Sequence, residues 1–285
     1  MTIAVTGATG QLGRLIVAAL KTRAPGETLV ALVRDPAKAA DLGIEARRFD
    51  YDTSPEAELE ANLAGIDKLV LISGNEVGKR TAQHRRAIDA AKAAGVGEII
   101  YTSLLHADHS PLNLAEEHVA TEAMLKASGI PHTVLRNGWY AENYTGSIGA
   151  AIEHGAVIGA AGAGKIAAAA RKDYAEAAAA VAAGTGHQGK VYELVADQPW
   201  TLADYAAEIA RQTGKEIAYV NLSEADYAAA LVKAGLPEGF AAMIASWDVG
   251  ASQGALFDES RALSTLIGRP TTPLAEVVKA ALQSA

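Results

Sequence analysis

The chain has 285 residues, a formal net charge of −8 at pH 7 and a hydrophobic fraction of 50%. The apolar content suffices for a large globular core, while the acidic balance excludes the generally basic surface that nucleic-acid binding requires. Because the chain contains no cysteine, disulfides, thiolate catalysis and Cys-ligated metal or iron–sulfur sites are excluded.

The N-terminus passes from Met1 directly into a short apolar run, without the basic segment and long apolar core of a signal peptide. Charged side chains interrupt the alanine-rich segment 160–184, which therefore predicts a helix with its approach loop rather than a membrane span. We expect a cytoplasmic protein without membrane insertion, either a monomer or a homodimer.

Short β-rich runs alternate with helical stretches along the first 136 residues. The expected strands are 3–6, 29–34, 45–49, 68–72, 98–103 and 132–136, and the clearest helices are 12–20, 81–94 and 114–127. Gly95 and Gly129 follow the last two helices as C-terminal glycines. This alternation predicts an α/β fold with a doubly wound parallel sheet of the Rossmann type, whose strand carboxyl ends form a ligand site.

The pattern loosens after Arg136, where glycine and alanine are frequent up to Gly189. A further strand is expected at 191–195, and helices are expected at 202–212, 223–234 and 273–282. We therefore predict a sheet domain at 1–136 and a smaller substrate lobe that takes up most of 137–285, with some segments returning to the first domain.

A glycine-rich loop follows the first expected strand, with the sequence Gly7-Ala8-Thr9-Gly10-Gln11-Leu12-Gly13. Gly7 permits a tight turn, Gly10 lets backbone amides approach a pyrophosphate, and Gly13 lets the next helix pack closely on the strand. The spacing also occurs in turns that bind no ligand. Its position between the first strand and the first helix favours dinucleotide binding.

The second expected strand ends at Arg34, where dinucleotide-binding domains place either an acid for the ribose hydroxyls or a base for a 2′-phosphate. Asp35 follows and leaves NAD possible, but Asp35-Pro36 is also a typical turn start. Lys38 is either a second phosphate contact or a solvated residue. We expect the domain at 1–136 to bind NADPH through Arg34, with a merely exposed arginine as the alternative.

Four segments carry a more specific resemblance: Thr6-Gly7-Ala8-Thr9-Gly10-Gln11-Leu12-Gly13, Tyr101-Thr102-Ser103-Leu104-Leu105-His106-Ala107-Asp108, Arg136-Asn137-Gly138-Trp139-Tyr140-Ala141-Glu142-Asn143-Tyr144 and Asp248-Val249-Gly250-Ala251-Ser252. Through them the chain resembles, over essentially its whole length, the NmrA-like group of atypical short-chain dehydrogenases. That group contains fungal NmrA-type regulators and bacterial NAD(P)H:quinone oxidoreductases, and the chain is more similar to the second.

The resemblance implies a set of cofactor-binding residues. Proteins of this group hold the cofactor with the glycine loop, the basic residue after the second strand, the end of the fourth strand and a Gly-Trp-Tyr loop. In this sequence these are Gly7, Ala8, Thr9, Gly10, Gln11 and Leu12, then Arg34, then Ser73, Gly74 and Asn75, and finally Gly138, Trp139, Tyr140, Ala141, Glu142 and Asn143. Gly74 and Asn75 depart from the expected serine-rich strand end, so backbone contacts are implied there.

Most short-chain dehydrogenases exchange a proton through a Tyr-x-x-x-Lys pair, and none of the nine tyrosines here is followed by lysine at that distance. The related isoflavone-reductase-like enzymes use a lysine at a place where this chain has His118. His118 is either an acid or a partly exposed helix residue beside Glu116 and Glu117. Alcohol dehydrogenase, epimerase and dehydratase chemistry therefore lack their usual acid.

A small quinone tolerates this loss, because hydride addition yields a stable phenolate that can take its proton from water. We expect two-electron reduction of a quinone by NADPH, by direct hydride transfer without flavin or metal. Asn143 is the expected hydrogen-bond donor, with Tyr140 beside it. Trp139 and Tyr144 are either flat walls of the substrate site or core residues.

The run His106-Ala107-Asp108-His109 follows the fifth expected strand. Three ligands within one loop seldom share a metal without a distant partner, so we expect no metal site. His106 instead either faces the substrate as a third catalytic residue or is a solvated loop residue. The rival to the enzyme is a regulator that senses NADP(H) without turnover, which the NmrA resemblance allows.

Overall fold

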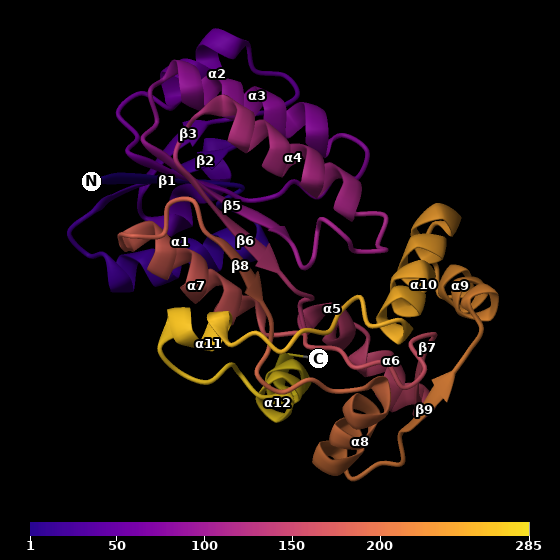
Figure 1. Ribbon diagram of the computed structural model, residues 1–285. Helices are drawn as coiled ribbons and strands as arrows, with labels where there is room; N and C mark the ends of the chain where they lie inside the picture. The colour runs from indigo at the N-terminus through magenta and orange to yellow at the C-terminus, as the bar shows by residue number, and fades with distance from the viewer. Residues whose placement is uncertain (285) are drawn as a thin grey trace.

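The computed structural model describes residues 1–284, and its centre is a parallel sheet of seven strands (Figure 1). The sheet contains, in spatial order, β3 (Glu45–Arg48), β2 (Thr28–Val33), β1 (Thr2–Thr6), β4 (Lys68–Leu71), β5 (Glu98–Leu104), β6 (His132–Asn137) and β8 (Val191–Leu194). Every residue of β5 is buried, as expected for a central strand covered on both faces. The predicted Rossmann-type sheet is confirmed.

Helices cover both faces of this sheet (Figure 1). On one face α1 (Gln11–Arg23) packs against α7 (Arg171–Ala183), and α11 (Ala262–Ile267) packs on α7. Buried alanines on α7 contribute little bulk, so they allow the two long helices to approach closely. On the other face lie α2 (Glu56–Asn62), α3 (Arg80–Ala93) and α4 (Ala115–Ser128), while the short 3-10 helix η1 (Pro36–Leu42) follows β2.

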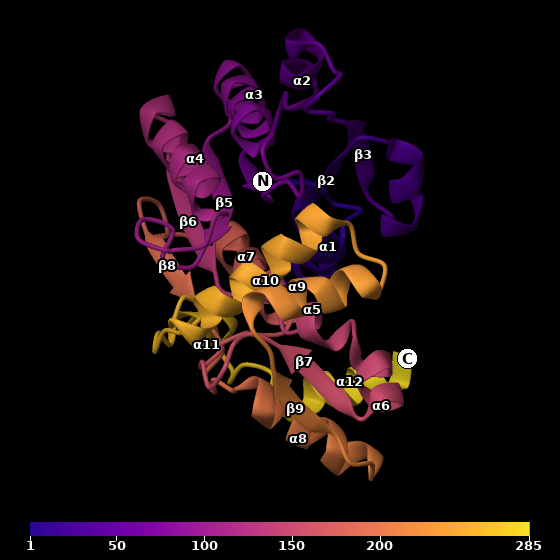
Figure 2. The same ribbon diagram turned by 90° about the vertical axis from the view of Figure 1, so that its right-hand side faces the viewer.

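A smaller lobe lies beyond the carboxyl ends of β5 and β6 (Figure 2). It contains the parallel pair β7 (Ala156–Gly159) and β9 (Ala218–Asn221) together with α5 (Glu142–Thr145), α6 (Ile148–His154), α8 (Leu202–Thr213), α9 (Glu224–Lys233), α10 (Glu238–Ser252) and α12 (Leu274–Ser284). Its core is separate from the cores on the two faces of the sheet. The loops that leave β5 and β6 therefore lie between sheet and lobe.

The chain passes between the two parts more than once. β8 pairs with β6 and α7 covers the sheet, although both come after Arg136, and α12 belongs to the lobe. A boundary at residue 136 stays a prediction. Among residues 1–284, no helix has the length and apolar character that a membrane crossing needs.

The short strands of the lobe and helix α10 were not predicted. β7 and β9 have four residues each, and α10 contains two glycines, which weaken its helical pattern. A Cβ on Gly250 would lie 2.5 Å from the Leu112 side chain, so this glycine allows α10 to approach the loop before α4. Tertiary packing, not local preference, explains this glycine.

Candidate active site

The turn after β1 leaves the N-terminus of α1 open. Gly7 adopts φ = +57°, and its carbonyl oxygen accepts the Gly10 N–H at 2.8 Å. Gly10 is the N-cap, and within residues 1–284 no side chain caps this helix end. A Cβ on Gly13 would collide with the Gly7 carbonyl oxygen, so helix and loop cross where only glycine fits. Uncapped amides at a helix N-terminus fit the phosphates of a dinucleotide.

The other residues of the loop differ in what they can offer a ligand. Ala8 and Leu12 are buried in the core against the sheet, so only their backbone atoms are available. Thr9 is half-buried and Gln11 is exposed. The fit to a dinucleotide therefore rests on the backbone of this turn.

Arg34 lies exposed at the end of β2, with its Nη1 3.9 Å from a carboxylate oxygen of Glu76. Asp35 accepts the Ala37 N–H at 3.1 Å and caps η1, as expected for the start of a turn. The carboxylate of Asp35 is thus committed to the backbone, which leaves Arg34 as the group at this strand end that is suited to a phosphate. Lys38 is exposed.

The residues after β4 are held by the protein interior. The Ser73 N–H donates to Thr102 Oγ1 at 2.9 Å, and the Gly74 N–H donates to Nε2 of His84 at 3.0 Å. The Gly74 carbonyl accepts from the Arg80 guanidinium at 2.6 Å. The sequence predicted backbone contacts to the cofactor here, but these two amides are already bonded within the chain, and Asn75 is the exposed member of the three.

The loop after β6 brings Tyr140 and Asn143 against the start of α7. The Arg171 guanidinium lies 4.6 Å above the Tyr140 ring and donates to Asn143 Oδ1 at 3.3 Å. The Glu142 carboxylate accepts the Arg171 N–H at 2.9 and 3.0 Å. Asn143 is exposed and Tyr140 is half-buried. The two predicted residues are thus neighbours, joined by an arginine that sequence reasoning did not select.

Tyr174 supports this loop from beneath. Its buried hydroxyl donates to the Trp139 carbonyl at 3.1 Å, and its ring meets the Tyr140 ring edge to face at 5.3 Å. A Cβ on Gly138 would lie 3.1 Å from the same hydroxyl. Close packing on α7 and β8 therefore explains this glycine without a cofactor, while Ala141 is buried and donates its N–H to Ala169.

The aromatic side chains of the loop point to different surroundings. Half-buried Trp139 meets Trp247 of α10 edge to face at 5.4 Å, and Trp247 Nε1 donates to Asn113 Oδ1 at 2.9 Å. Half-buried Tyr144 packs on Trp200, a core residue of the lobe, with ring centroids 5.0 Å apart. Burial raises the pKa of Tyr144 well above its usual value. Both expected walls are half-buried and pack against the core of the lobe.

A buried polar network lies behind the strand ends. The Tyr101 hydroxyl and Nδ1 of His118 are 2.8 Å apart, and His84 Nδ1 bonds Thr121 at 2.9 Å. Of the two alternatives for His118, the partly exposed helix residue is excluded, because the residue is 6% exposed and faces the sheet from α4. Burial lowers the pKa of His118 to about 3, with the charge of Arg80 acting in the same direction. The imidazole is therefore neutral at pH 7.

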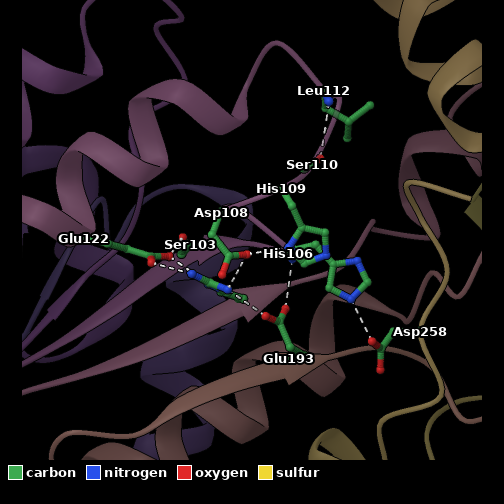
Figure 3. Close-up of polar contacts among 10 residues, drawn as sticks. Ser103, His106, Asp108, His109, Ser110, Leu112, Glu122, Glu193 and Asp258 are labelled. Carbon is green, nitrogen blue, oxygen red and sulfur yellow. Dashed lines mark hydrogen bonds and ion pairs between the residues drawn. The ribbon is translucent and has the colours of Figure 1, made fainter.

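His106 lies in the loop after β5 with φ = 54°, the left-handed region. Its Nε2 pairs with Asp258 at 2.7 Å, and its ring stacks on His109 at 4.9 Å. Figure 3 shows His106 pointing toward Asp258, away from Glu122. One ring nitrogen of the predicted catalytic histidine is therefore bonded to the segment that follows α10.

Arg136 forms an ion-pair cluster beside this loop. It is 8% exposed and contacts carboxylates of Glu122, Asp108 and Glu193 at 2.8, 3.0 and 2.9 Å. Two of these acids fix the loop. Asp108 belongs to the loop, and Glu193 also accepts the His106 N–H at 3.0 Å. Across residues 1–284, no group of three or more His, Cys, Asp or Glu side chains has an arrangement that could hold a metal ion.

A family model described as NAD(P)H-binding matches residues 7–185. Quinone oxidoreductase 2 of Escherichia coli is 60% identical over 279 residues, which cover 97% of each chain. The chain belongs to this NAD(P)H-binding family. The resemblance to the NmrA-like group is thereby confirmed on its quinone oxidoreductase side.

Solved structures of other members have the same fold. The crystal structure of NADPH-dependent quinone oxidoreductase QOR2 from Escherichia coli complexed with NADPH gives a TM-score of 0.95 at 59% identity, covering 98% of this chain and 99% of that one. Triphenylmethane reductase of Citrobacter sp. gives 0.94 at 38% identity, covering 99% and 100%. The NmrA mutant structure gives 0.78 at 18% identity over 98% and 94%, which shows the fold alone.

Sequence reasoning on this NAD(P)H-binding protein missed Arg171, Tyr174 and Asp258. Arg171 and Asn143 are 28 residues apart, and His106 and Asp258 are 152 apart. No spacing pattern links such pairs. A weak signal existed for Arg171, because a charged residue at the start of an otherwise alanine-rich helix lies at the end where a sheet of this kind binds ligands.

Proposed function

We propose that the protein reduces small quinones with NADPH by direct hydride transfer, in a two-electron step without flavin or metal. The identity to Escherichia coli quinone oxidoreductase 2 supports this function because it extends over 97% of both chains and so includes sheet, loop and lobe. The observation in the structure that carries the proposal is the Tyr140–Asn143 loop, which lies fixed on Arg171 beyond the sheet's strand ends.

We further propose which residues hold the cofactor. The backbone amides of Gly10 and of the uncapped N-terminus of α1 bind the pyrophosphate, and Arg34 binds the 2′-phosphate. Ser73, Gly74 and Asn75 border the dinucleotide after β4, and residues 138–143 border the nicotinamide. When bound, NADPH supplies the hydride. We also propose that the protein is a monomer or a homodimer and that it is located in the cytoplasm.

In the proposed reaction the chain positions the quinone and stabilises the charge that develops on it. The hydride adds two electrons and one hydrogen to the acceptor, and negative charge develops on the opposite quinone oxygen. Asn143 donates an amide hydrogen to this oxygen, while Tyr140 lies beside it. Water supplies the one proton that completes the hydroquinone, because the phenolate is stable without an acid. The buried Tyr101–His118 pair is neutral and lies between β5 and α4.

The decisive experiment follows the near-ultraviolet absorbance of NADPH in the presence of benzoquinone or a naphthoquinone, with the uncatalysed rate subtracted. Turnover with a primary isotope effect from deuterium at nicotinamide C4 is expected, since that C–H bond breaks in the proposed step. Added flavin should leave the rate unchanged. NADPH binding without turnover of either quinone would contradict the enzyme and favour the regulator.

A further inference from the structure

Arg171 lies at the first position of α7 and contacts three residues of the loop after β6. Its side chain is 14% exposed. Its guanidinium lies over the Tyr140 ring at 4.6 Å and donates to Asn143 Oδ1 at 3.3 Å, while its backbone N–H donates to the Glu142 carboxylate. A side chain of this length loses much rotamer freedom when so enclosed, and the contacts with the loop offset that cost.

The contact with Arg171 determines which way the Asn143 amide points. Arginine carries only donors, so the atom of Asn143 that faces it must be the oxygen. The amide nitrogen, with its two hydrogens, is therefore turned away from Arg171. An asparagine in this orientation offers donors, not an acceptor, to a group beside the loop.

Arg171 also adds positive charge to this part of the site. Burial raises the pKa of Tyr140, while the hydrogen bond from Asn137 and the charge of Arg171 lower it, so the field of the guanidinium reaches that hydroxyl. The Glu142 carboxylate neutralises the charge of Arg171 only in part, since its nearest oxygen lies 3.9 Å from Arg171 Nη1. Positive charge near a donor favours acceptors that become negative during the reaction.

We propose that Arg171 is a positioning residue that orients the Asn143 amide toward the quinone oxygen and, through its charge, stabilises the phenolate that develops there. The inference rests on the proposed function. In the step, the C4–H bond of the cofactor breaks, the acceptor gains the hydride, and the electron pair that is displaced on the quinone resides on the oxygen facing Asn143 until water protonates it. Arg171 keeps its proton throughout.

The test compares Arg171→Gln, which removes the charge and keeps an amide donor, with Arg171→Lys, which keeps the charge. We expect Gln to lower kcat for benzoquinone roughly tenfold, below the full value of a donor in a dry site because Asn143 is exposed. Lys should recover at least half of that loss. The Kd for NADPH, measured by fluorescence titration, should change less than about twofold in both variants.

Two further measurements separate this role from simple structural support. Lys172→Gln removes the same charge from the neighbouring exposed position and should leave kcat unchanged. In a double-mutant cycle, Arg171→Gln should cost much less when Asn143 is already alanine, because the two act as one unit. Melting temperatures of all variants confirm that they fold.

The outcomes distinguish the two proposals. If the parent protein fails to reduce quinones, the proposed function is wrong. If it reduces them but Gln and Lys lose equal activity, if the double mutant is additive, or if Gln loses NADPH binding or the fold, Arg171 is a structural or cofactor residue and the inference is overturned.

Discussion

Replacing Arg34 with alanine should weaken the binding of NADPH and spare that of NADH. The two cofactors differ by the 2′-phosphate, and Arg34 is the cation at the end of β2 where that phosphate is expected. Asp35, the acid that could have favoured NADH, is occupied as the cap of η1.

The size of the effect follows from the exposure of Arg34. A hydrogen bond to a charged group contributes about 1.5 to 3 kcal/mol when one partner is removed. The Arg34 side chain is 69% exposed, so water screens the contact and the lower end applies. About 1.5 kcal/mol corresponds to a rise of roughly tenfold in the Kd for NADPH. Glu76 limits the gain further, because its carboxylate lies 3.9 Å from Arg34 and repels a phosphate.

The assay is a titration of each cofactor against the parent protein and Arg34→Ala, by calorimetry or tryptophan fluorescence. Arg23→Ala is the matched control, since it removes an exposed arginine at the far end of α1. Equal weakening of NADPH and NADH by Arg34→Ala would refute the reasoning and make Arg34 a structural residue.

Three other expectations test the interior and the loop. Asn143→Asp should reduce kcat for quinones by up to about 100-fold with NADPH affinity retained, because a carboxylate repels the developing phenolate; unchanged turnover would exclude the donor role. Tyr101→Phe and His118→Ala should each lower kcat by less than about 100-fold, the smallest effect typical of a general acid, and a larger loss with normal cofactor binding would restore an acid-catalysed mechanism. Burial raises the pKa of Asp248 to about 6, above its ordinary 3.8, and its carboxylate accepts the Ala160 N–H. A raised carboxyl pKa means that stability is lost as pH rises. Between pH 4 and 7 the parent should therefore lose roughly 2 kcal/mol of unfolding free energy relative to Asp248→Asn in urea melts; a difference that does not vary with pH would contradict this.

The sheet was predictable because its signals are local. Each strand is a short apolar run, and the turn after β1 is encoded by three glycines within seven residues, whose geometry here is the one their spacing predicts. The role of Asp35 at the start of a turn was likewise predictable from the proline that follows it.

The side-chain environment of the site was less predictable. His118 has two acidic neighbours in sequence, which suggested exposure, but the helix turns it toward Tyr101 in the interior. Tyr144 is adjacent to Asn143, yet the two lie in different surroundings, since Tyr144 is half-buried against the core of the lobe and Asn143 is exposed. A helix separates neighbours by about 100° around its axis, and only the packing of distant elements determines which of them is buried.

The repeated crossing of the chain between sheet and lobe limits how this architecture can be rearranged. A fragment ending at residue 136 would lose β8 and α7, and so would expose one edge of the sheet and the apolar face of α1 that α7 covers. Such a fragment should aggregate instead of folding as a module. The lobe is therefore not a module joined at one junction, because several separate connections of one continuous scaffold link it to the sheet.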